Sequence, residues 1–149
     1  MTRDKVLDNI ENITDIGNCF TMSVTGCSML PLLGHKGDKI VIRRTSPTEN
    51  ISHRIAMFRN ANRHIVVHRV VSIMDDVVTL QGDGNPKQRE RCKRNEIIGI
   101  VERVIRRNGK EIDCTTRCWR LREQLWLTQP RFVRSYALAI IRRWLNFKN

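Results

Sequence analysis

The pattern of hydrophobic and polar positions changes twice along the chain and divides it into three parts. Over residues 3–16, apolar side chains recur at the spacing of a short amphipathic helix that Gly17 ends. From Phe20 onward, apolar residues alternate with polar ones, as on a half-buried strand. The helical spacing returns near the C-terminus and is interrupted at Pro130. The pattern predicts an N-terminal helix (1–18), a β domain (19–116) and a helical tail of two amphipathic helices (117–149).

Short segments rich in β-branched and aromatic residues predict the strands of the β domain. These segments cover residues 20–24, 39–43, 54–58, 64–73, 77–81, 97–105 and 111–115. Asn108-Gly109 is a strong signal for a two-residue hairpin turn. Residues 82–95 are polar and show no apolar periodicity, so we expect a loop there. The fold class predicted is mainly β, with an antiparallel sheet that coils or partly closes into a barrel to protect its edges.

Basic charge is concentrated in the second half of the chain. The 149 residues carry a formal net charge of +12, and residues 86–149 hold seventeen of the basic side chains but only six of the acidic ones. Six of the eight aromatic residues lie in the last 33 positions. A basic, aromatic tail favours an anionic surface, either lipid headgroups or nucleic acid. No helix-turn-helix or zinc-finger pattern accompanies the charge, which makes nucleic acid the less favoured partner.

The tail therefore has two main interpretations. Its helices either pack on the sheet and keep their arginines in water, or they lie in a membrane interface with tryptophan and apolar residues among the headgroups. The candidate membrane-contact residues are Trp119, Trp126, Arg131, Arg134, Arg142, Arg143 and Trp144.

Other classes of protein are disfavoured by composition. No stretch approaches the roughly 20 apolar residues that cross a bilayer. The N-terminal segment is acidic and has no apolar core, unlike a secretory signal. Five cysteines, an odd number without paired C-x-x-C spacing, predict neither a disulfide framework nor a zinc site. We expect a cytoplasmic protein, peripherally membrane-associated if the tail binds lipid, with no metal or cofactor.

Three motifs in the β domain occur in a specific order. Thr25-Gly26-Cys27-Ser28-Met29-Leu30-Pro31 follows a predicted strand, and a Gly37-Asp38 pair precedes the next one. His68-Arg69-Val70 lies on a later strand, and Gly82-Asp83-Gly84-Asn85 follows the strand after that. At these residues, roughly 20–106, the chain resembles the type I signal peptidase family and its self-cleaving repressor relatives. The conjunction of the motifs is more specific than any one of them.

The resemblance implies a catalytic role for a serine, a histidine and an acid. Ser28 matches the nucleophile, and its backbone N–H would be an oxyanion donor. His68 stands where most bacterial members have a lysine base, as in the Ser-His-Asp branch of the family, and histidine titrates near pH 7 without a large pKa shift. Asp83 is the favoured acid to orient the imidazole, with Glu90 as the alternative. Cys27 could attack as a thiolate, but neighbouring strand residues point to opposite faces, so we take Ser28.

The same resemblance predicts a serine endopeptidase that cleaves a leader or precursor peptide. The substrate would lie extended beside the strand that leads to Ser28, with small side chains before the cut. Met22, Val24, Gly26 and Met29 are the expected substrate-binding residues. The rival hypothesis is a non-catalytic scaffold of the same fold that binds membrane or nucleic acid through its tail. A self-cleaving repressor is disfavoured, because those proteins use a lysine at the position of His68.

Overall fold

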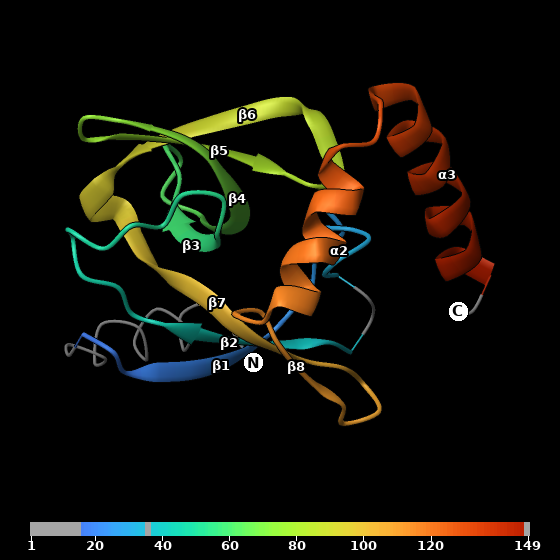
Figure 1. Cartoon of the computed structure of the whole chain (residues 1–149), viewed down its shortest axis with the longest axis horizontal. Coiled ribbons are helices and arrows are strands. Elements are labelled where there is room, and N and C mark those ends of the chain that lie inside the picture. Colours follow the sequence, from blue (N-terminus) through green and yellow to red (C-terminus); the bar gives the residue numbers. More distant parts are fainter. Residues whose placement is uncertain (1–15, 35–36, 148–149) are drawn as a thin grey trace.

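A computed structural model describes residues 16–34 and 37–147, so the predicted helix at 3–16 lies almost entirely outside the described residues. The described chain forms eight strands followed by two helices (Figure 1). The strands are β1 (Cys19–Ser23), β2 (Lys39–Arg43), β3 (Ile55–Arg59), β4 (Ile65–Met74), β5 (Val77–Gly82), β6 (Asn85–Lys93), β7 (Ile97–Ile105) and β8 (Glu111–Asp113). The helices are α2 (Arg117–Leu127) and α3 (Arg131–Phe147), and a 3₁₀ turn, η1 (Arg94–Glu96), joins β6 to β7.

The strands form one antiparallel sheet. Its order is β1-β2-β7-β3-β4-β5-β6, with β8 paired to β7. The sheet coils, so that the β1–β2 end and the β5–β6 end lie on opposite sides of the body in Figure 1. The predicted mainly β fold is confirmed. The sheet is not closed into a barrel, because β1 and β6 are the two ends of its strand order.

The prediction of a loop at residues 82–95 is wrong, because most of this segment is β6. The strand pairs with β5 from Val77↔Lys93 to Gly82↔Asn85. Nearly all its side chains are polar or charged, and only Cys92 is buried. A terminal strand needs backbone hydrogen bonds on one side only, and charged side chains protect its free edge from further pairing. The apolar periodicity used to predict strands is therefore missing here.

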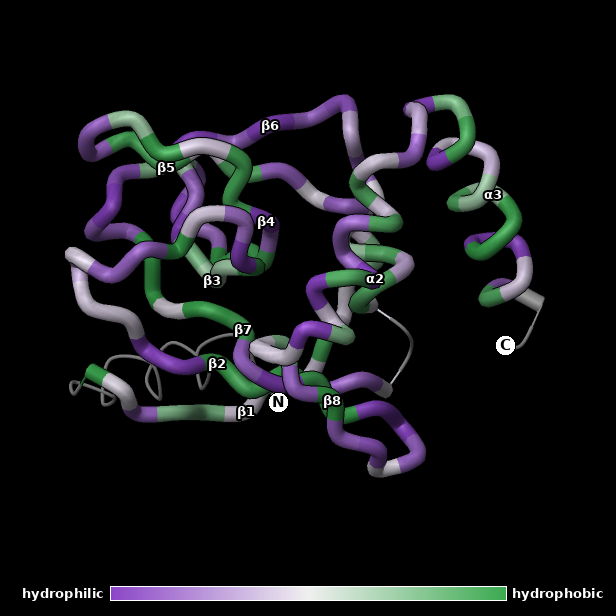
Figure 2. Tube along the Cα trace, viewed as in Figure 1, coloured by the Kyte–Doolittle hydropathy of each residue, from purple (hydrophilic) through white to green (hydrophobic). Residues whose placement is uncertain are grey.

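Two apolar clusters fill the coiled sheet. One joins β2 and β7 to the loop after β1 and to Trp119 of α2, and the other includes Phe58, Val70 and Leu80. Figure 2 shows the apolar positions along β2 and β7 that contribute to the first cluster. The first cluster thus fixes both the segment that carries Ser28 and the helix that follows the sheet.

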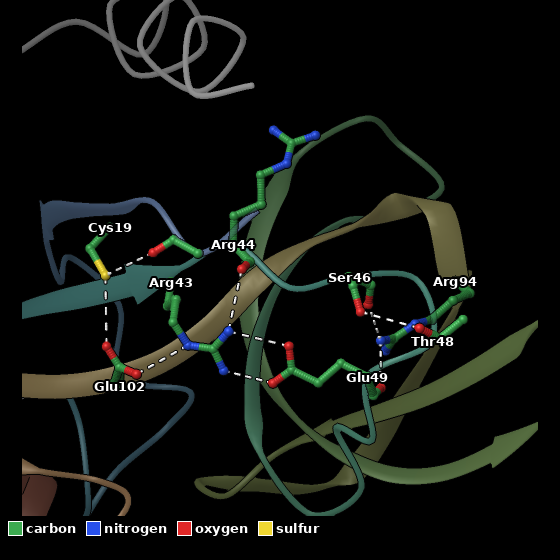
Figure 3. A network of polar contacts seen from close by, with 9 residues as sticks. Cys19, Arg43, Arg44, Ser46, Thr48, Glu49, Arg94 and Glu102 are labelled. Atoms are coloured by element: carbon green, nitrogen blue, oxygen red, sulfur yellow. Dashed lines mark hydrogen bonds and ion pairs between the residues drawn. The ribbon is translucent and has the colours of Figure 1, made fainter. Parts of the chain in front are cut away.

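Arg43 connects β2 to β7 and to the β2–β3 connection (Figure 3). Its guanidinium donates to Glu102 of β7 at 3.1 Å and to Glu49 at 2.6 Å. The hydrogen bond from Arg43 is the main reason why the pKa of Glu49 is lowered. Arg94 donates to three backbone carbonyls of the same turn, at residues 46, 47 and 49. These contacts hold the β2–β3 connection and have no link to the motifs of the candidate site.

The two predicted C-terminal helices are confirmed, and the break between them falls at Pro130. Thr116 caps α2 by accepting a hydrogen bond from the Trp119 N–H. Neither described helix is long and apolar enough to cross a membrane.

Candidate active site

Ser28 lies at the start of a turn directly after the extended segment that continues β1. The turn is anchored on both sides of the serine: Leu30 N–H donates to Cys27 O at 3.3 Å, and Leu33 N–H donates to Met29 O at 2.9 Å. Met29 and Leu30 are buried, whereas Ser28 is half-buried. The apolar residues that follow Ser28 therefore hold the turn against the core and leave the serine at its surface.

The ion pair between buried Asp38 and half-buried Arg106 also positions this turn. Asp38 is 1% exposed and forms an ion pair with Arg106, whose guanidinium also donates to Leu32 O at 3.0 Å. The backbone carbonyl of Asp38 accepts a hydrogen bond from Val24 N–H at 2.9 Å. The Gly-Asp pair noticed in the sequence thus ties β2 to both ends of the segment that carries Ser28.

His68 lies in the middle of β4, opposite Ala56 of β3, and is 9% exposed. Its ring packs against Phe58 with the ring centroids 5.9 Å apart. Burial lowers the pKa of His68 below its ordinary value, and the negative charges of Glu90 and Asp83 only partly oppose this effect. The imidazole is therefore neutral at pH 7, as a general base must be.

Glu90 approaches the imidazole from β6. Its Oε2 lies 3.4 Å from Nδ1 of His68, and its Oε1 accepts a hydrogen bond from the Asn60 side chain at 3.4 Å. The His68–Glu90 approach is slightly longer than a well-formed hydrogen bond, yet both atoms are buried and neither has another partner among the described residues. A buried carboxylate beside Nδ1 favours the tautomer with its proton there, which leaves Nε2 free to accept a proton.

Asp83 does not contact His68, although the sequence favoured it as the orienting acid. Both of its carboxylate oxygens accept hydrogen bonds from Arg69, at 2.8 and 2.7 Å, and both side chains are 2% exposed. Arg69 follows His68 directly, and successive side chains of a strand point to opposite faces. The carboxylate that pairs with Arg69 therefore lies on the other face of β4 from the imidazole. Glu90, and not Asp83, is thus the carboxylate that lies beside the imidazole.

Arg69 was not singled out by the sequence analysis. It also donates to His53 O at 2.8 Å and to Glu123 of α2 at 2.9 Å. Burial alone would lower its pKa, but the hydrogen bonds and charges of Asp83 and Glu123 outweigh burial, and the pKa is raised. Arg69 is thus a permanent buried cation that links β4, the 82–84 turn and α2. In the sequence, the only indication of this role was the position of Arg69 in the His68-Arg69-Val70 motif.

Two glycines allow the 82–84 turn to approach both Ser28 and His68. A Cβ on Gly82 would lie 2.6 Å from Ser28 O and 3.3 Å from Nε2 of His68. A Cβ on Gly84 would lie 2.9 Å from Cys27 O, and Gly84 N–H donates to Ser28 O at 2.7 Å. The turn therefore lies against both the Nε2 edge of the imidazole and the Ser28 backbone. The Ser28 hydroxyl itself makes no hydrogen bond to His68 among the described residues, and such bonds often tighten only when substrate is bound.

A small cavity opens beside Ser28. All four predicted substrate-binding residues line it, together with Ser28 and three residues of β4 just before His68: Met22, Val24, Gly26, Met29, Ile65, Val66 and Val67. Its volume of about 190 Å³ is below the range of pockets that hold drug-sized ligands. The cavity is mostly apolar and suits a short side chain.

Cys27 lines a different cavity, which lies between the Ser28 turn and α3. Arg142 and Leu145 of α3 form its other wall, and its volume is about 660 Å³. Cys27 does not line the cavity beside Ser28, and Ser28 does not line the cavity of Cys27. The two neighbours therefore line different cavities, although they lie in the turn after β1 and not on a strand, where the sequence analysis had expected them.

The tail packs directly against the 82–84 turn of the candidate site. Trp126 Nε1–H and Arg134 donate to the backbone carbonyl of Asp83, at 3.4 and 3.1 Å. Arg142 donates to Gly84 O at 2.9 Å, and the Arg134 guanidinium stacks over the Trp126 ring at 5.5 Å. These contacts fix the 82–84 turn from the side opposite to Ser28.

Several candidate membrane-contact residues are therefore placed differently from the prediction. Trp119 is 1% exposed in the core, where its indole N–H donates to Glu123 at 2.7 Å, and Arg134 is 9% exposed. Trp126 and Arg142 contact the turn, as described above. Arg131, Arg143 and Trp144 are exposed on α3. The sequence showed an amphipathic tail but gave no means to tell which apolar stripe meets the sheet.

No group of three or more metal-ligating side chains is assembled within residues 16–34 and 37–147. Burial raises the pKa of the Cys92 and Cys114 thiols to about 12, so both thiols are protonated at neutral pH.

Comparisons of the chain with protein families, with curated proteins and with solved structures found no match.

Proposed function

We propose that the protein is a serine endopeptidase of the type I signal peptidase kind, with Ser28 as nucleophile, His68 as general base and Glu90 as the acid that orients the imidazole. The observation that carries the proposal is the position of the buried His68 ring. Its Nδ1 lies beside Glu90, and its Nε2 lies against Gly82 next to the Ser28 turn. A histidine with a carboxylate at one ring nitrogen and its other ring nitrogen toward a turn that carries a serine supports activation of that hydroxyl for acyl transfer.

In the proposed reaction, Ser28 Oγ attacks the scissile carbonyl carbon while Nε2 of His68 accepts its proton. The resulting imidazolium is stabilised by the Glu90 carboxylate. When the C–N bond breaks, the same proton passes to the leaving amine, and an ester on Ser28 remains. A water molecule, deprotonated by His68, then hydrolyses the ester and releases the new carboxylate. The Ser28 N–H, which makes no hydrogen bond within the described residues, is available to the oxyanion.

The substrate of the proposed enzyme is an extended leader or precursor peptide. The outer edge of β1 has no partner strand among the described residues and could pair with a peptide strand, because β1 ends the strand order of the sheet. A peptide on this edge would run toward Ser28 past the cavity that Met22, Val24 and Met29 line. The small volume of that cavity supports a short side chain next to the cleaved bond.

A serine-directed acylating probe tests the proposal without knowledge of the natural substrate. A fluorophosphonate should label the wild-type protein, and Ser28→Ala should abolish labelling. Cys27→Ala is the matched control, because it alters the neighbouring residue on the other cavity and should leave labelling in place. His68→Gln should slow labelling by at least about a thousandfold, as for the base of a catalytic triad.

Two results of the labelling experiment would contradict the proposal. Labelling that persists in Ser28→Ala but is lost in Cys27→Ala would move the nucleophile to the thiol. A wild-type protein that is folded but not labelled would contradict catalysis and leave the scaffold hypothesis. Mass spectrometry of the labelled peptide locates the adduct in either case.

A further inference from the structure

The outward side of α3 carries an unusual set of exposed apolar residues. Its inward side is formed by Arg134 and Leu138, which are buried, and by Ile141 and Leu145, which are half-buried. The outer face, as we call it here, consists of exposed side chains at helical spacing on another sector of the helix: Phe132, Val133, Tyr136, Ile140 and Trp144. Phe132 and Tyr136 are 75% and 73% exposed, so packing on the body does not account for them.

The charge around the outer face has a single sign. Four arginines lie on α3, and residues 124–149 contain no aspartate or glutamate. Arg134 is buried against the body and Arg142 contacts Gly84, whereas Arg131 and Arg143 are exposed near the two ends of the helix. Apolar and aromatic side chains with arginines at both ends are typical of a helix that lies in the headgroup layer of an anionic membrane.

The same charge distribution disfavours other occupants of the outer face. A second copy would bring two faces together that both carry arginine and no carboxylate, so like charges would oppose the contact. Nucleic acid would use the arginines but would leave five large apolar side chains without a role. An anionic bilayer matches both the apolar residues and the charge.

We propose that α3 is an interfacial helix that docks the protein on anionic lipid bilayers through Phe132, Val133, Tyr136, Ile140 and Trp144. The inner side of α3 contacts the 82–84 turn, so docking holds the Ser28 turn about one helix diameter from the headgroups. The helix shown in red at the right of Figure 1 stands at one side of the molecule, with the coiled sheet beyond α2. The proposal does not depend on peptide hydrolysis, and it assigns the membrane contact to a set of residues largely different from that expected from the sequence.

Vesicle flotation with the full chain tests the proposal. The wild-type protein should float with vesicles of phosphatidylcholine and phosphatidylglycerol, should float far less with phosphatidylcholine alone, and should be released by salt. Phe132→Ser combined with Tyr136→Ser should weaken the binding at least tenfold, since each substitution removes a large apolar contact. Met74→Ser is the matched control. Met74 is 74% exposed and is the last residue of β4, an element that α2 and the sheet separate from α3 (Figure 1), so its loss should not change binding.

Tryptophan fluorescence supplies a second readout. Emission should shift to the blue on addition of the anionic vesicles. Trp144→Phe should remove most of the shift, because Trp119 is already buried and Trp126 is half-buried against the 82–84 turn. Absence of binding to anionic vesicles would overturn the proposal, as would equal binding by the double variant. A dimer in light scattering that the double variant converts to a monomer would overturn it in favour of self-association. Binding to duplex DNA that exceeds vesicle binding and survives the double substitution would assign the charge to nucleic acid instead.

Discussion

Nδ1 of His68 and Oε2 of Glu90 lie 3.4 Å apart, although β5 separates the strands that carry them. Both atoms are buried, and neither makes a hydrogen bond among the described residues. The neighbouring residue, Arg69, is paired with Asp83 on the other face of β4. Two adjacent residues thus lie beside two different carboxylates: Glu90 lies next to the His68 imidazole, and Asp83 pairs with Arg69 and holds the 82–84 turn.

The first prediction separates the roles of these carboxylates. Glu90→Gln should reduce the rate of probe labelling by about a hundredfold to ten-thousandfold, because the imidazole loses the charge that stabilises its protonated form. Asp83→Asn should instead destabilise the protein by about 3 kcal/mol, because it breaks a buried ion pair and leaves the Arg69 charge poorly compensated. Labelling rates and urea denaturation, measured on both variants, distinguish the two effects. The opposite result, a stable Asp83→Asn protein without labelling, would return the catalytic role to Asp83.

The second prediction concerns pH. The pKa of His68 is lowered mainly by burial, so the labelling rate should rise with pH through a midpoint below 6.5 and be constant at neutral pH. Glu90 raises the pKa of His68, so residual labelling by Glu90→Gln should have its midpoint at still lower pH. A rate profile for each protein between pH 4 and 8 gives both values. A midpoint that moves upward in Glu90→Gln would contradict the placement of this carboxylate.

The third prediction concerns stability, which also depends on the lowered pKa of His68. Because the fold holds His68 neutral, the stability contributed by this group is fully present above the unfolded pKa of about 6.5 and is lost as the pH falls through the lower folded pKa. The free energy of unfolding should therefore fall with decreasing pH more steeply in the wild type than in His68→Gln. Denaturant titrations at several pH values measure this difference, and parallel curves would show that His68 does not contribute.

The fourth prediction concerns the close approach of the 82–84 turn. Gly82→Ala places a methyl group 2.6 Å from the carbonyl oxygen of Ser28, so the turn has to shift. We expect a loss of about 1–3 kcal/mol in stability together with loss of labelling. Gly26→Ala is the control for stability, since a Cβ there has no atom within 4 Å. Thermal denaturation of both variants makes the comparison, and an unchanged Gly82→Ala protein would mean that the turn is less tightly packed than described.

The fifth prediction concerns the attachment of the tail to the body. Trp119→Ala should destabilise the protein by about 3–5 kcal/mol, since this side chain is buried in the core. Trp119→Phe keeps an aromatic ring and removes the indole donor to Glu123, so it should cost only about 1–2 kcal/mol. If both variants unfold at the wild-type urea concentration, Trp119 does not hold α2 to the sheet.

The amino-acid sequence by itself determined the strands whose side chains alternate or are uniformly apolar, such as β2 and β7, because burial requires that pattern. It also determined the two helices and the break at Pro130, and it brought Ser28, His68 and the 82–85 turn to attention through their motifs. The tertiary structure alone decided that β6 is a strand, because an edge strand is held by its neighbour's backbone rather than by apolar side chains.

Only the tertiary structure, again, decided which partner each charged group has. Asp83 and Glu90 are seven residues apart and chemically alike. Arg69 and His68 lie on opposite faces of β4, and this alone pairs Asp83 with Arg69 and places Glu90 beside His68. Likewise, Trp119 and Phe132 are both aromatic residues of a basic tail, but Trp119 is buried in the core and Phe132 is exposed to solvent. Periodicity indicates that a helix has an apolar stripe, whereas the shape of the sheet determines which stripe is buried.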